Sequence, residues 1–444
     1  MRNSMGKRIL LTIIALIIGA GIVACGGGGG SSPAASSSPS STSSSSSGNS
    51  SAPAVTTLAQ VMSQGTTNNQ VQNLAVGDLN GDGLDDVVIG GWNVDAPTAK
   101  FSILIQNTDG TLTDQTANWV ANNTYGGSQH VFIADFNNDG KMDVFFPGFD
   151  DGATEYPEHS VVLWNNGTSF ARVNLPELTM SHGACVDDIN GDGFLDVLVG
   201  GGPGGSVGGI YINNRNNTFT LNQTALFNAT GGNFFAACAV SHESNGNIDI
   251  FFGNTSSVSG YRNNIAVFDS NLNLLSNTGV NPVDSNGHST TGSDLIDMLA
   301  IDVNGDGKKD FIGIYNMLGA NGTPAFTGDI AGKRILLWTG AGQYTYSTTI
   351  DSQFENLYFT STSTIGGYPA VFFSGSNDQA MLYQLINGAF VSYKQQRFTD
   401  MAIQAGISSP TTINYAVGSS IVYQNNGNPY MLQLLNGVWY TERM

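Results

Sequence analysis

Four short segments of this chain place oxygen-bearing side chains at the same alternating positions. Each nine-residue segment carries Asp, Asn, Asp and Asp at its first, third, fifth and ninth positions, with Gly at the sixth. Ca²⁺ takes about six to eight oxygen ligands, and a tight loop can supply them from alternate side chains and one backbone carbonyl, here that of the seventh residue. Gly at the sixth position permits the turn that folds the chain around an ion. The predicted ligands are Asp78, Asn80, Asp82, Leu84 and Asp86; Asp135, Asn137, Asp139, Lys141 and Asp143; Asp188, Asn190, Asp192, Phe194 and Asp196; and Asp302, Asn304, Asp306, Lys308 and Asp310, with Leu84, Lys141, Phe194 and Lys308 acting through their backbone carbonyls.

The same residue pattern begins an EF-hand, which is the first alternative. An EF-hand requires Glu at position 12 of the loop and helices on both sides. Position 12 is Ile89, Phe146, Val199 or Gly313 in the four segments, and the residues that follow each segment are β-branched or aromatic. A single Asp/Asn/Gly cluster is often only a solvated turn. Four copies with the same spacing, each followed by a strand-like run, instead predict about four Ca²⁺ sites.

The metal loops recur at a period typical of repeated structural units. Asp78 and Asp135 are 57 residues apart, and Asp135 and Asp188 are 53 residues apart. A further 53 residues lead to Ser241, which begins a degenerate copy that keeps Gly and Asp at its sixth and ninth positions. Within the first unit, the β-branched and aromatic runs predict four strands, over residues 72–77, 86–90, 101–106 and 111–115. Four-stranded units at this period are the blades of a β-propeller.

Two more units without metal loops follow the first five. Residues 369–393 and 421–440 carry similar strand-like runs and share a turn, Leu-Ile-Asn-Gly in one and Leu-Leu-Asn-Gly in the other. The sequence therefore predicts an all-β fold, a single β-propeller of seven four-stranded blades. Six or eight blades remain open, because the sequence does not reveal how residues 55–70 close the ring.

These loops and their period resemble the FG-GAP/VCBS repeat family, whose calcium-loop β-propellers include the heads of integrin α-chains. The resemblance covers roughly residues 70–440. It is strong in the four units with complete metal loops, weak in the unit that contains Ser241, and architectural only in the last two units. It implies that each metal loop joins the innermost strand of a blade to the next strand. The degenerate loop departs from the family pattern, which puts calcium binding there in doubt.

The N-terminus predicts export and a lipid anchor. A basic start precedes an apolar run over residues 9–24, which is short for a membrane span. Residues 22–25 resemble a bacterial lipobox, which implies cleavage before Cys25 and lipidation of its thiol. An uncleaved anchor and a plain secretory signal are the alternatives. Gly26 replaces the Asp that is associated with retention in the inner membrane, so the lipobox resemblance favours the outer membrane of the bacterial cell envelope.

Composition completes the predicted organisation: a signal peptide over residues 1–24, a tether over 25–54 and the propeller over 55–444. The tether is almost entirely Gly, Ser and Pro, and behaves as a flexible chain. The net charge is −19 with only 15 basic residues, which argues against nucleic acid as a partner because its binding needs a basic surface. Membrane contact is predicted only through the lipid on Cys25.

Two further cysteines occupy equivalent positions in neighbouring units. Cys185 lies three residues before Asp188, and Cys238 lies three residues before Ser241. Both are therefore expected on the innermost strands of adjacent blades. The oxidising periplasm permits a disulfide between them, and two buried thiols are the alternative.

Aromatic and acidic residues gather in the segments predicted at the end opposite the metal loops. Aromatic rings beside carboxylates at the mouth of a channel suit the binding of a sugar or a peptide, while loop polarity and capping of strand ends are the alternative explanation. The candidate ligand face consists of Trp92, His130, Phe149, Tyr156, His159 and His182.

The sequence carries no convincing catalytic motif. The Gly-Gly-Ser-Val-Gly run at 204–208 lacks the strand–turn–helix context of a nucleophile elbow. The predicted function is a calcium-stabilised propeller of the cell envelope that binds a glycan or a protein, with no catalysis expected. Two alternatives remain open: a polysaccharide-active lyase or hydrolase with its site at the channel mouth, and an assembly scaffold in an envelope complex.

Overall fold

A computed structural model describes most of the region predicted to form the propeller. The described residues are 69–93, 99–149, 158–179, 181, 183–201, 208–223, 237–253, 264–279, 294–302, 309–316, 332–340, 343–347, 357–365, 368–375, 379–387, 389–397, 420–435 and 438–443. The predicted signal peptide, Cys25 and the tether lie outside the described residues.

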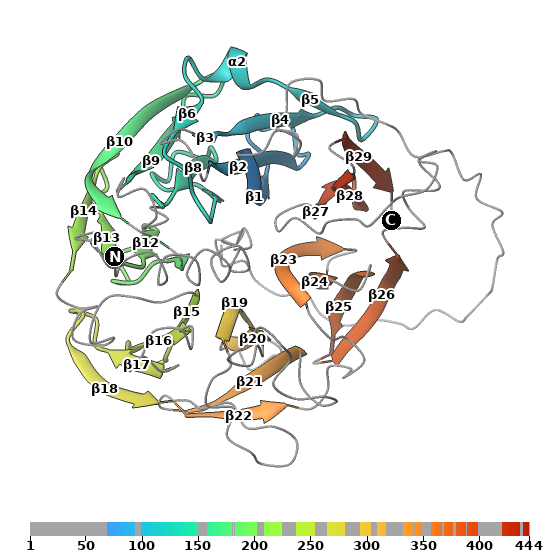
Figure 1. The fold of residues 1–444 in the computed structure, drawn as a ribbon. Coiled ribbons are helices and arrows are strands. Elements are labelled where there is room, and N and C mark those ends of the chain that lie inside the picture. The colour runs from blue at the N-terminus through green and yellow to red at the C-terminus, as the bar shows by residue number, and fades with distance from the viewer. Residues whose placement is uncertain are drawn as a thin grey trace, which may run out of the picture.

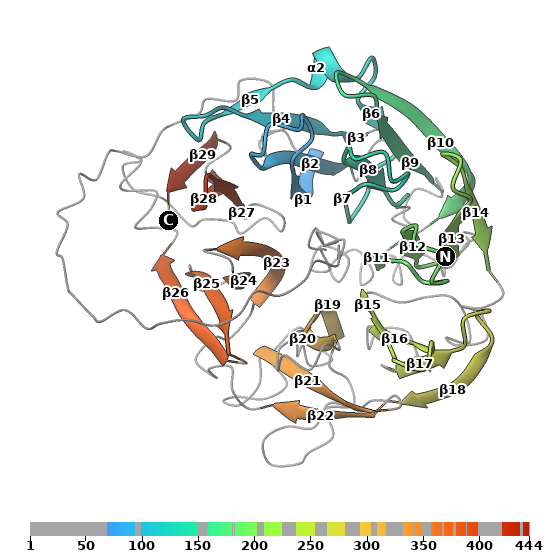
Figure 2. The same ribbon diagram turned by 180° about the vertical axis from the view of Figure 1, so that it is seen from behind.

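Antiparallel sheets are arranged around a common centre, as the two opposite views in Figures 1 and 2 show. We number the larger sheets of the described residues in chain order. Sheet 1 contains β1 (Asn69–Gly77), β2 (Asp86–Asn93), β4 (Ser102–Gln106) and β5 (Leu112–Asp114); sheet 2 contains β7 (Phe132–Ala134), β8 (Asp143–Phe146), β9 (Glu158–Asn165) and β10 (Phe170–Thr179); sheet 3 contains β11 (Ala184–Asp187), β12 (Asp196–Val199), β13 (Gly209–Asn213) and β14 (Phe219–Asn222). Sheet 4 contains β15 (Ala237–His242), β16 (Ile248–Gly253), β17 (Asn264–Phe268) and β18 (Leu274–Gly279); sheet 5 contains β19 (Asp294–Ile301), β20 (Asp310–Asn316), β21 (Gly332–Gly340) and β22 (Gln343–Ser347); sheet 6 contains β23 (Leu357–Ile365), β24 (Tyr368–Gly375), β25 (Gln379–Ile386) and β26 (Ala389–Arg397); sheet 7 contains β27 (Ser420–Asn425), β28 (Asn428–Leu435) and β29 (Val438–Arg443).

The first strand of each sheet lies nearest the centre, and the last strand of the four-stranded sheets lies at the periphery (Figure 1). β27 contacts β1, so sheet 7 lies beside sheet 1. The prediction of an all-β β-propeller is confirmed. The strands predicted in the first unit match β1, β2, β4 and β5 to within a few residues. The pair β3 (Ala99–Lys100) and β6 (Thr124–Tyr125) and the short helix α2 (Thr116–Trp119) were not predicted.

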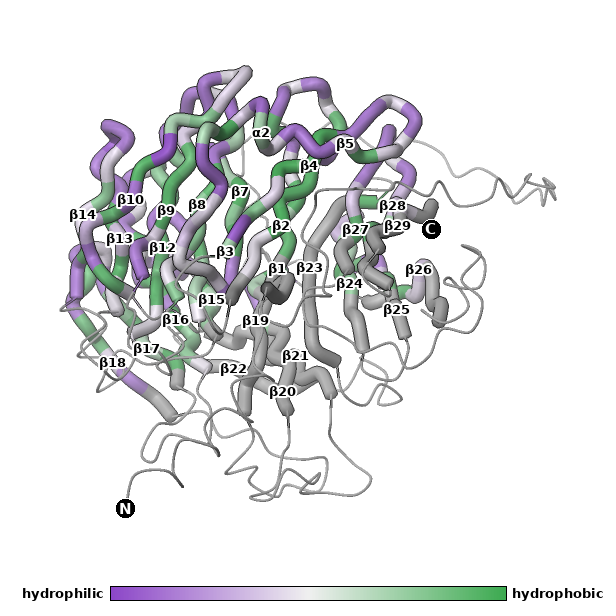
Figure 3. The backbone as a smooth tube through the Cα atoms, turned by 45° about the horizontal axis from the view of Figure 1, so that its top comes forward, coloured by the Kyte–Doolittle hydropathy of each residue, from purple (hydrophilic) through white to green (hydrophobic). Residues whose placement is uncertain are grey.

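Hydrophobic packing between neighbouring sheets explains why the inner strands are apolar on both faces. In β8, Phe145 packs with sheet 3 while Phe146 packs with sheet 1, because successive side chains of a strand point to opposite faces. The same alternation places Leu198 against sheet 4 and Val197 against sheet 2. Figure 3 shows hydrophobic residues along the strands of sheets 1–3 and hydrophilic residues in their connecting loops. Continuous apolar runs are thus the signature of strands buried between two sheets.

Sheet 7 joins sheet 1 through both packing and hydrogen bonds. Tyr423 and Leu432 are buried in one cluster with residues of β1, β2 and β4. The Tyr423 hydroxyl donates a hydrogen bond to the carbonyl of Gly110 over 2.7 Å. A Cβ at Gly110 would lie 2.7 Å from the Tyr430 ring, and the φ of +86° at this position also favours glycine. This turn of sheet 1 is therefore shaped to receive two aromatic rings of sheet 7.

No helix among the described residues is both long enough and apolar enough to cross a membrane.

Replacing Leu432 by Ala should lower the free energy of unfolding by about 2–5 kcal/mol, because it leaves a cavity where sheet 7 meets sheet 1. Denaturant unfolding followed by intrinsic fluorescence measures this change. Leu275→Ala is the matched control, since Leu275 is 54% exposed and its loss should change stability by less than about 0.5 kcal/mol. Equal effects of the two substitutions would contradict the packing of sheet 7 against sheet 1.

Candidate metal centre and ligand face

Three predicted metal loops lie at the same end of sheets 1, 2 and 3, each between the innermost strand and the next. In the first loop, the Asp78 carboxylate accepts the backbone N–H groups of Asp82 at 3.1 Å and Gly83 at 2.8 Å. The φ of +84° at Gly83 is the turn that the pattern predicts at the sixth position. The other two loops repeat these bonds with Asp135 as acceptor from Asp139 and Gly140, and with Asp188 as acceptor from Asp192 and Gly193.

The third and fifth positions also fold inward on backbone donors. Asn80 Oδ1 accepts the N–H of Asp82 at 3.0 Å, and Asp82 Oδ1 accepts the N–H of Leu84 at 2.8 Å. The second and third loops carry the equivalent bonds. Each loop therefore presents oxygen donors of the kind a hard cation such as Ca²⁺ prefers. Among the described residues, no group of three or more His, Cys, Asp and Glu side chains is placed to hold a metal ion, so this fit rests on donor chemistry and loop conformation.

Basic side chains already contact the fifth position in two of the loops. Lys141 Nζ lies 3.1 Å from Asp139 Oδ2, and an Arg215 guanidinium nitrogen lies 2.9 Å from Asp192 Oδ2. The Lys141 and Arg215 side chains are exposed to solvent, and ion pairs of exposed side chains are weak. In the first loop the amide of Asn80 takes this place, at 2.9 Å from Asp82 Oδ2.

The Asp at the ninth position of each of these three loops accepts a backbone hydrogen bond on each of its two carboxylate oxygens. Asp86 is fully buried; its Oδ2 accepts the N–H of Leu79 and its Oδ1 accepts the N–H of Gln106, both at 2.8 Å. Asp143 and Asp196 make the equivalent bonds. Each carboxylate oxygen has two lone pairs, so these bonds do not prevent it from also contacting a cation.

Burial raises the pKa of Asp86 to about 7, although its two backbone hydrogen bonds oppose the shift. The charges of Asp82 and Asp78 add to the rise. The pKa values of Asp143 and Asp196 are raised to about 7 for the same reasons. A positive charge in the loop would favour the ionised form of all these carboxyls.

An amide side chain at the end of the third strand links each of these loops to the preceding sheet. Asn165 Nδ2 donates to the carbonyl of Leu79 in sheet 1 at 2.8 Å and to that of Met142 in its own sheet at 2.9 Å, while its backbone N–H bonds Asp143. We call this arrangement the amide clamp.

The clamp recurs in the two neighbouring sheets. Asn213 Nδ2 donates to the carbonyl of Phe136 in sheet 2 at 2.7 Å and to that of Leu195 at 3.1 Å. Gln106 Nε2 donates to Gln424 in sheet 7 at 2.9 Å. Sequence reasoning missed these residues, although each ends an apolar strand and is followed by Asn in a polar turn, as in Asn165-Asn166.

The fourth complete loop and the degenerate loop are only partly comparable. Asp302 and Asp310 are described, and Asp310 is fully buried, while Asn304, Asp306 and Lys308 lie outside the described residues. The degenerate loop closes on other groups: Asn245 Nδ2 donates to Glu243 Oε2 at 2.7 Å, and Asn245 Oδ1 accepts the N–H of Asn247 at 2.8 Å.

A charged cluster joins sheets 3, 4 and 5 at this end of the ring. Asp187 Oδ1 lies 2.9 Å from His242 Nε2, and Asp187 Oδ2 lies 2.6 Å from Lys309 Nζ. Burial alone would raise the pKa of Asp187, but the hydrogen bond from His242 and the charges of Lys309 and His242 hold that pKa below its ordinary value. The Ser241 hydroxyl also donates to the carbonyl of Lys309 at 3.0 Å.

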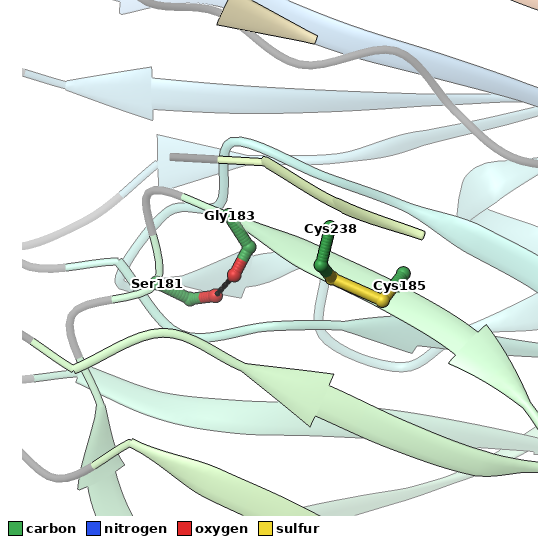
Figure 4. Close-up of a disulfide and its surroundings, with 4 residues drawn as sticks. All are labelled: Ser181, Gly183, Cys185 and Cys238. Carbon is green, nitrogen blue, oxygen red and sulfur yellow. Dashed lines mark hydrogen bonds between the residues drawn. A yellow bond between two sulfur atoms is a disulfide. The ribbon is translucent and has the colours of Figure 1, made fainter. Parts of the chain in front are cut away.

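Cys185 and Cys238 are joined by a disulfide between β11 and β15, with their Cα atoms 5.7 Å apart (Figure 4). Both side chains are buried in the cluster between sheets 3 and 4. Nearby, the Ser181 hydroxyl donates to the carbonyl of Gly183 at 2.7 Å. Of the two alternatives that the sequence leaves open, the structure contains the bond.

Two members of the candidate ligand face are buried side chains. His130 is 3% exposed and stacks on Phe132 with ring centroids 6.0 Å apart, and Phe149 is 1% exposed. Neither side chain is exposed to solvent, so we do not retain these two as candidates for ligand contact.

The other four members divide by location. Trp92 belongs to β2 and His159 to β9, so both lie in strands and not in the predicted connections. The side chain of His159 is partly exposed. The side chain of Trp92, and the whole of Tyr156 and His182, lie outside the described residues.

Residues 78–146 match the profile of the FG-GAP-like repeat. These residues span the first two metal loops and run from the start of the first loop to the end of β8. Together with the ring of antiparallel sheets, this match supports an FG-GAP repeat β-propeller. No curated protein matches the chain in sequence.

Two solved structures show similarity of shape at low sequence identity. The structure of BBS1N in complex with ARL6DN has a TM-score of 0.46 and 12% identity, covering 84% of this chain and 91% of that one. A protein named as an exo-beta-1,3-galactanase of Bifidobacterium bifidum s17 has a TM-score of 0.39 and 12% identity, covering 63% of this chain and 92% of that one. At this level of similarity, neither protein informs the function of this chain.

Replacing Asn165 by Leu should lower the free energy of unfolding by about 2–3 kcal/mol, because it leaves the buried carbonyl of Leu79 and the partly buried carbonyl of Met142 without their donor. Asn166→Leu is the matched control: the Asn166 side chain is exposed, so this substitution should change the free energy of unfolding by no more than about 0.5 kcal/mol. Denaturant unfolding of both variants measures the difference. A result in which Asn165→Leu is as stable as the control would show that the amide clamp does not hold the sheets together.

Proposed function

We propose that this chain is a calcium-stabilised propeller of the bacterial cell envelope, which binds a glycan or a protein partner. The observation that carries the proposal is the repetition of one loop conformation, with the same backbone hydrogen bonds, in three adjacent sheets. We also propose that the ring has seven blades, with sheet 7 as the last, in support of which β27 contacts β1.

The case for calcium rests on charge as well as on donor type. In each of the three described loops, the negative charges of the Asp residues at the first and fifth positions raise the pKa of the Asp at the ninth position. Such a group is most stable with a bound cation. When bound, Ca²⁺ would supply positive charge and fixed coordination, and so would hold the innermost strand to the next. The residues that would hold it are the first, third, fifth and ninth side chains and the seventh carbonyl of each loop.

The case for a ligand face rests on the contrast between the two ends of the ring. The metal loops repeat one conformation, as a shared structural role requires. The segments at the other end differ from sheet to sheet in length and composition, for example the acidic and aromatic residues 148–159 and the glycine-rich residues 200–209. Binding residues concentrate on such variable loops when a rigid scaffold positions them. We therefore place recognition at that end, with Trp92, Tyr156, His159 and His182 as its remaining candidates.

The N-terminal segment supports a place in the cell envelope. The lipobox-like sequence before Cys25 and the Gly/Ser/Pro tether favour a lipid-anchored domain held away from the outer membrane. With about 26 flexible residues, the tether would reach roughly 28 Å.

Chelation should lower the melting temperature, because each occupied site adds about 2.7 kcal/mol of stability when free Ca²⁺ is about 100 times its Kd. Asp82→Ala should reduce the number of sites found by calorimetric titration by one and remove part of the stabilisation. Asp109→Ala is the control, since Asp109 is an Asp in an exposed turn of the same sheet. Unchanged melting after chelation, or fewer than three tight sites in the unmodified protein, would count against the calcium proposal.

The combined variant Trp92→Ala, Tyr156→Ala and His182→Ala should keep its fold and its calcium sites while losing its partner. A glycan array and a pull-down with the full chain, unmodified and variant, measure binding. Asn166→Ala combined with Asn216→Ala alters exposed turn residues at the metal-loop end and should leave binding intact. Retained binding in the triple variant, with loss in the control, would mean that recognition lies on the other face.

Cys25→Ser should abolish lipid attachment, because serine lacks the thiol that receives the first lipid group. Metabolic labelling with a fatty-acid probe, followed by gel analysis of the purified chain, reports the modification. Label that persists in the Cys25→Ser chain would refute the lipid anchor.

A further inference from the structure

Among the residues that the structure describes, sheet 4 lacks both the complete metal loop and the amide clamp of sheets 1–3. Its loop is degenerate, with Ser241 and Asn245 where the complete loops carry Asp. It also lacks the amide clamp. In sheet 3, Asn213 reaches the carbonyl of the eighth loop residue of its own sheet, and the residue paired with the eighth loop position of sheet 4, Ile248, is Phe268.

The side chain of Phe268 cannot donate a hydrogen bond. It is instead buried in the apolar cluster between sheets 3 and 4. The chain of hydrogen bonds that runs from sheet 7 through Gln106, Asn165 and Asn213 therefore ends at sheet 3. Sheet 4 must be held in the ring by other contacts.

Cross-links of a different kind meet at this sheet. The disulfide Cys185–Cys238 joins its innermost strand to that of sheet 3. His242 of sheet 4 contacts Asp187 of sheet 3, and the same carboxylate contacts Lys309 of sheet 5. The three sheets are thus tied together at the end of the ring where the metal loops lie.

We propose that the disulfide and the charged cluster of Asp187, His242 and Lys309 replace the metal ion and the amide clamp as the fasteners of sheet 4. Loss of the disulfide then lowers the local stability of sheet 4, and chelation does not. For sheets 1 and 2 the reverse holds: chelation lowers their local stability, and loss of the disulfide does not. The response of sheet 4 rests on the cross-links described above, whereas the response of sheets 1 and 2 rests on the calcium function proposed above.

The location of the cross-links explains why they suffice. Cys185 and Cys238 lie on the innermost strands, β11 and β15. Each of these strands is hydrogen-bonded to one other strand of its own sheet. A covalent bond there limits the separation of β11 and β15 in the locally opened state as well as in the closed one. The charged cluster acts on the same pair of strands at their loop ends, because Asp187 and His242 are the last residues of β11 and β15.

Hydrogen exchange of the full chain, read by mass spectrometry, tests the proposal strand by strand. In Cys185→Ala with Cys238→Ala, exchange in β15–β18 should rise by about tenfold or more while exchange in β1 and β2 stays unchanged. Addition of the chelator EGTA to the unmodified chain should give the reverse pattern. Asp187→Asn should raise exchange in β15 and β16 in the same direction as loss of the disulfide.

A double-mutant cycle separates the covalent bond from the packing of two thiols. If the bond matters, Cys185→Ala, Cys238→Ala and the double variant should raise exchange equally; if packing matters, the two single effects should add. If the variants do not fold, dithiothreitol added to the folded chain serves instead. It transfers two electrons and two protons to the disulfide, which gives two thiols and the cyclic disulfide of the reagent.

Unchanged exchange in β15–β18 after loss of the disulfide, additive single effects, or an equal rise in all sheets would each overturn the proposal. Absence of any response to EGTA would refute the calcium function alone, since the response of sheet 4 to its cross-links is measured separately.

Discussion

The buried carboxylate at the ninth position of each metal loop is the interaction on which the surrounding structure depends. In sheet 2, Asp143 binds the backbone of the loop with one oxygen and the backbone of the third strand with the other. A fully buried carboxylate is costly unless it is hydrogen-bonded on both oxygens. It therefore fixes the loop, the second strand and the third strand in one register. Asn165, whose N–H is one of those donors, is placed by this bond so that its side chain reaches sheet 1.

The same carboxylate would link the proposed metal binding to the architecture. Its partner in the loop belongs to the segment that carries the other oxygen donors, so a cation held there would act on a residue that already joins the loop to two strands. A cation bound to these nine residues would in this way influence a whole sheet. A surface calcium site, by contrast, would stabilise only its own loop. The position is also demanding: an Asn there would lack one acceptor oxygen, and a Glu would displace the loop from the strand.

The sequence predicts the repeated part of this structure well and the connecting part poorly. The metal loops, the first sheet and the propeller class follow from spacing and from β-branched runs, because each is local or is repeated several times. The amide clamp was missed because it depends on Asn165 or Asn213 reaching a different sheet, and a single Asn before a turn has many ordinary explanations. His130 and Phe149 were placed on a ligand face because of their position in the chain. Whether such a position is buried depends on how closely the neighbouring sheets approach each other, which the local sequence does not determine.

For Cys185 and Cys238, the sequence predicts the position of each residue but not whether they are bonded. Their equal offsets from the loop indicate adjacent inner strands, but only the separation of those strands decides whether a bond can form. With Cα atoms 5.7 Å apart, the bond is allowed. The same region includes sheet 4, which has Ser241 and Asn245 where the complete loops carry Asp, and Phe268 in place of the clamp. The proposal that a unique fastener takes the place of a repeated one fits a closed ring, since every sheet must be held by both of its neighbours for the ring to stay shut.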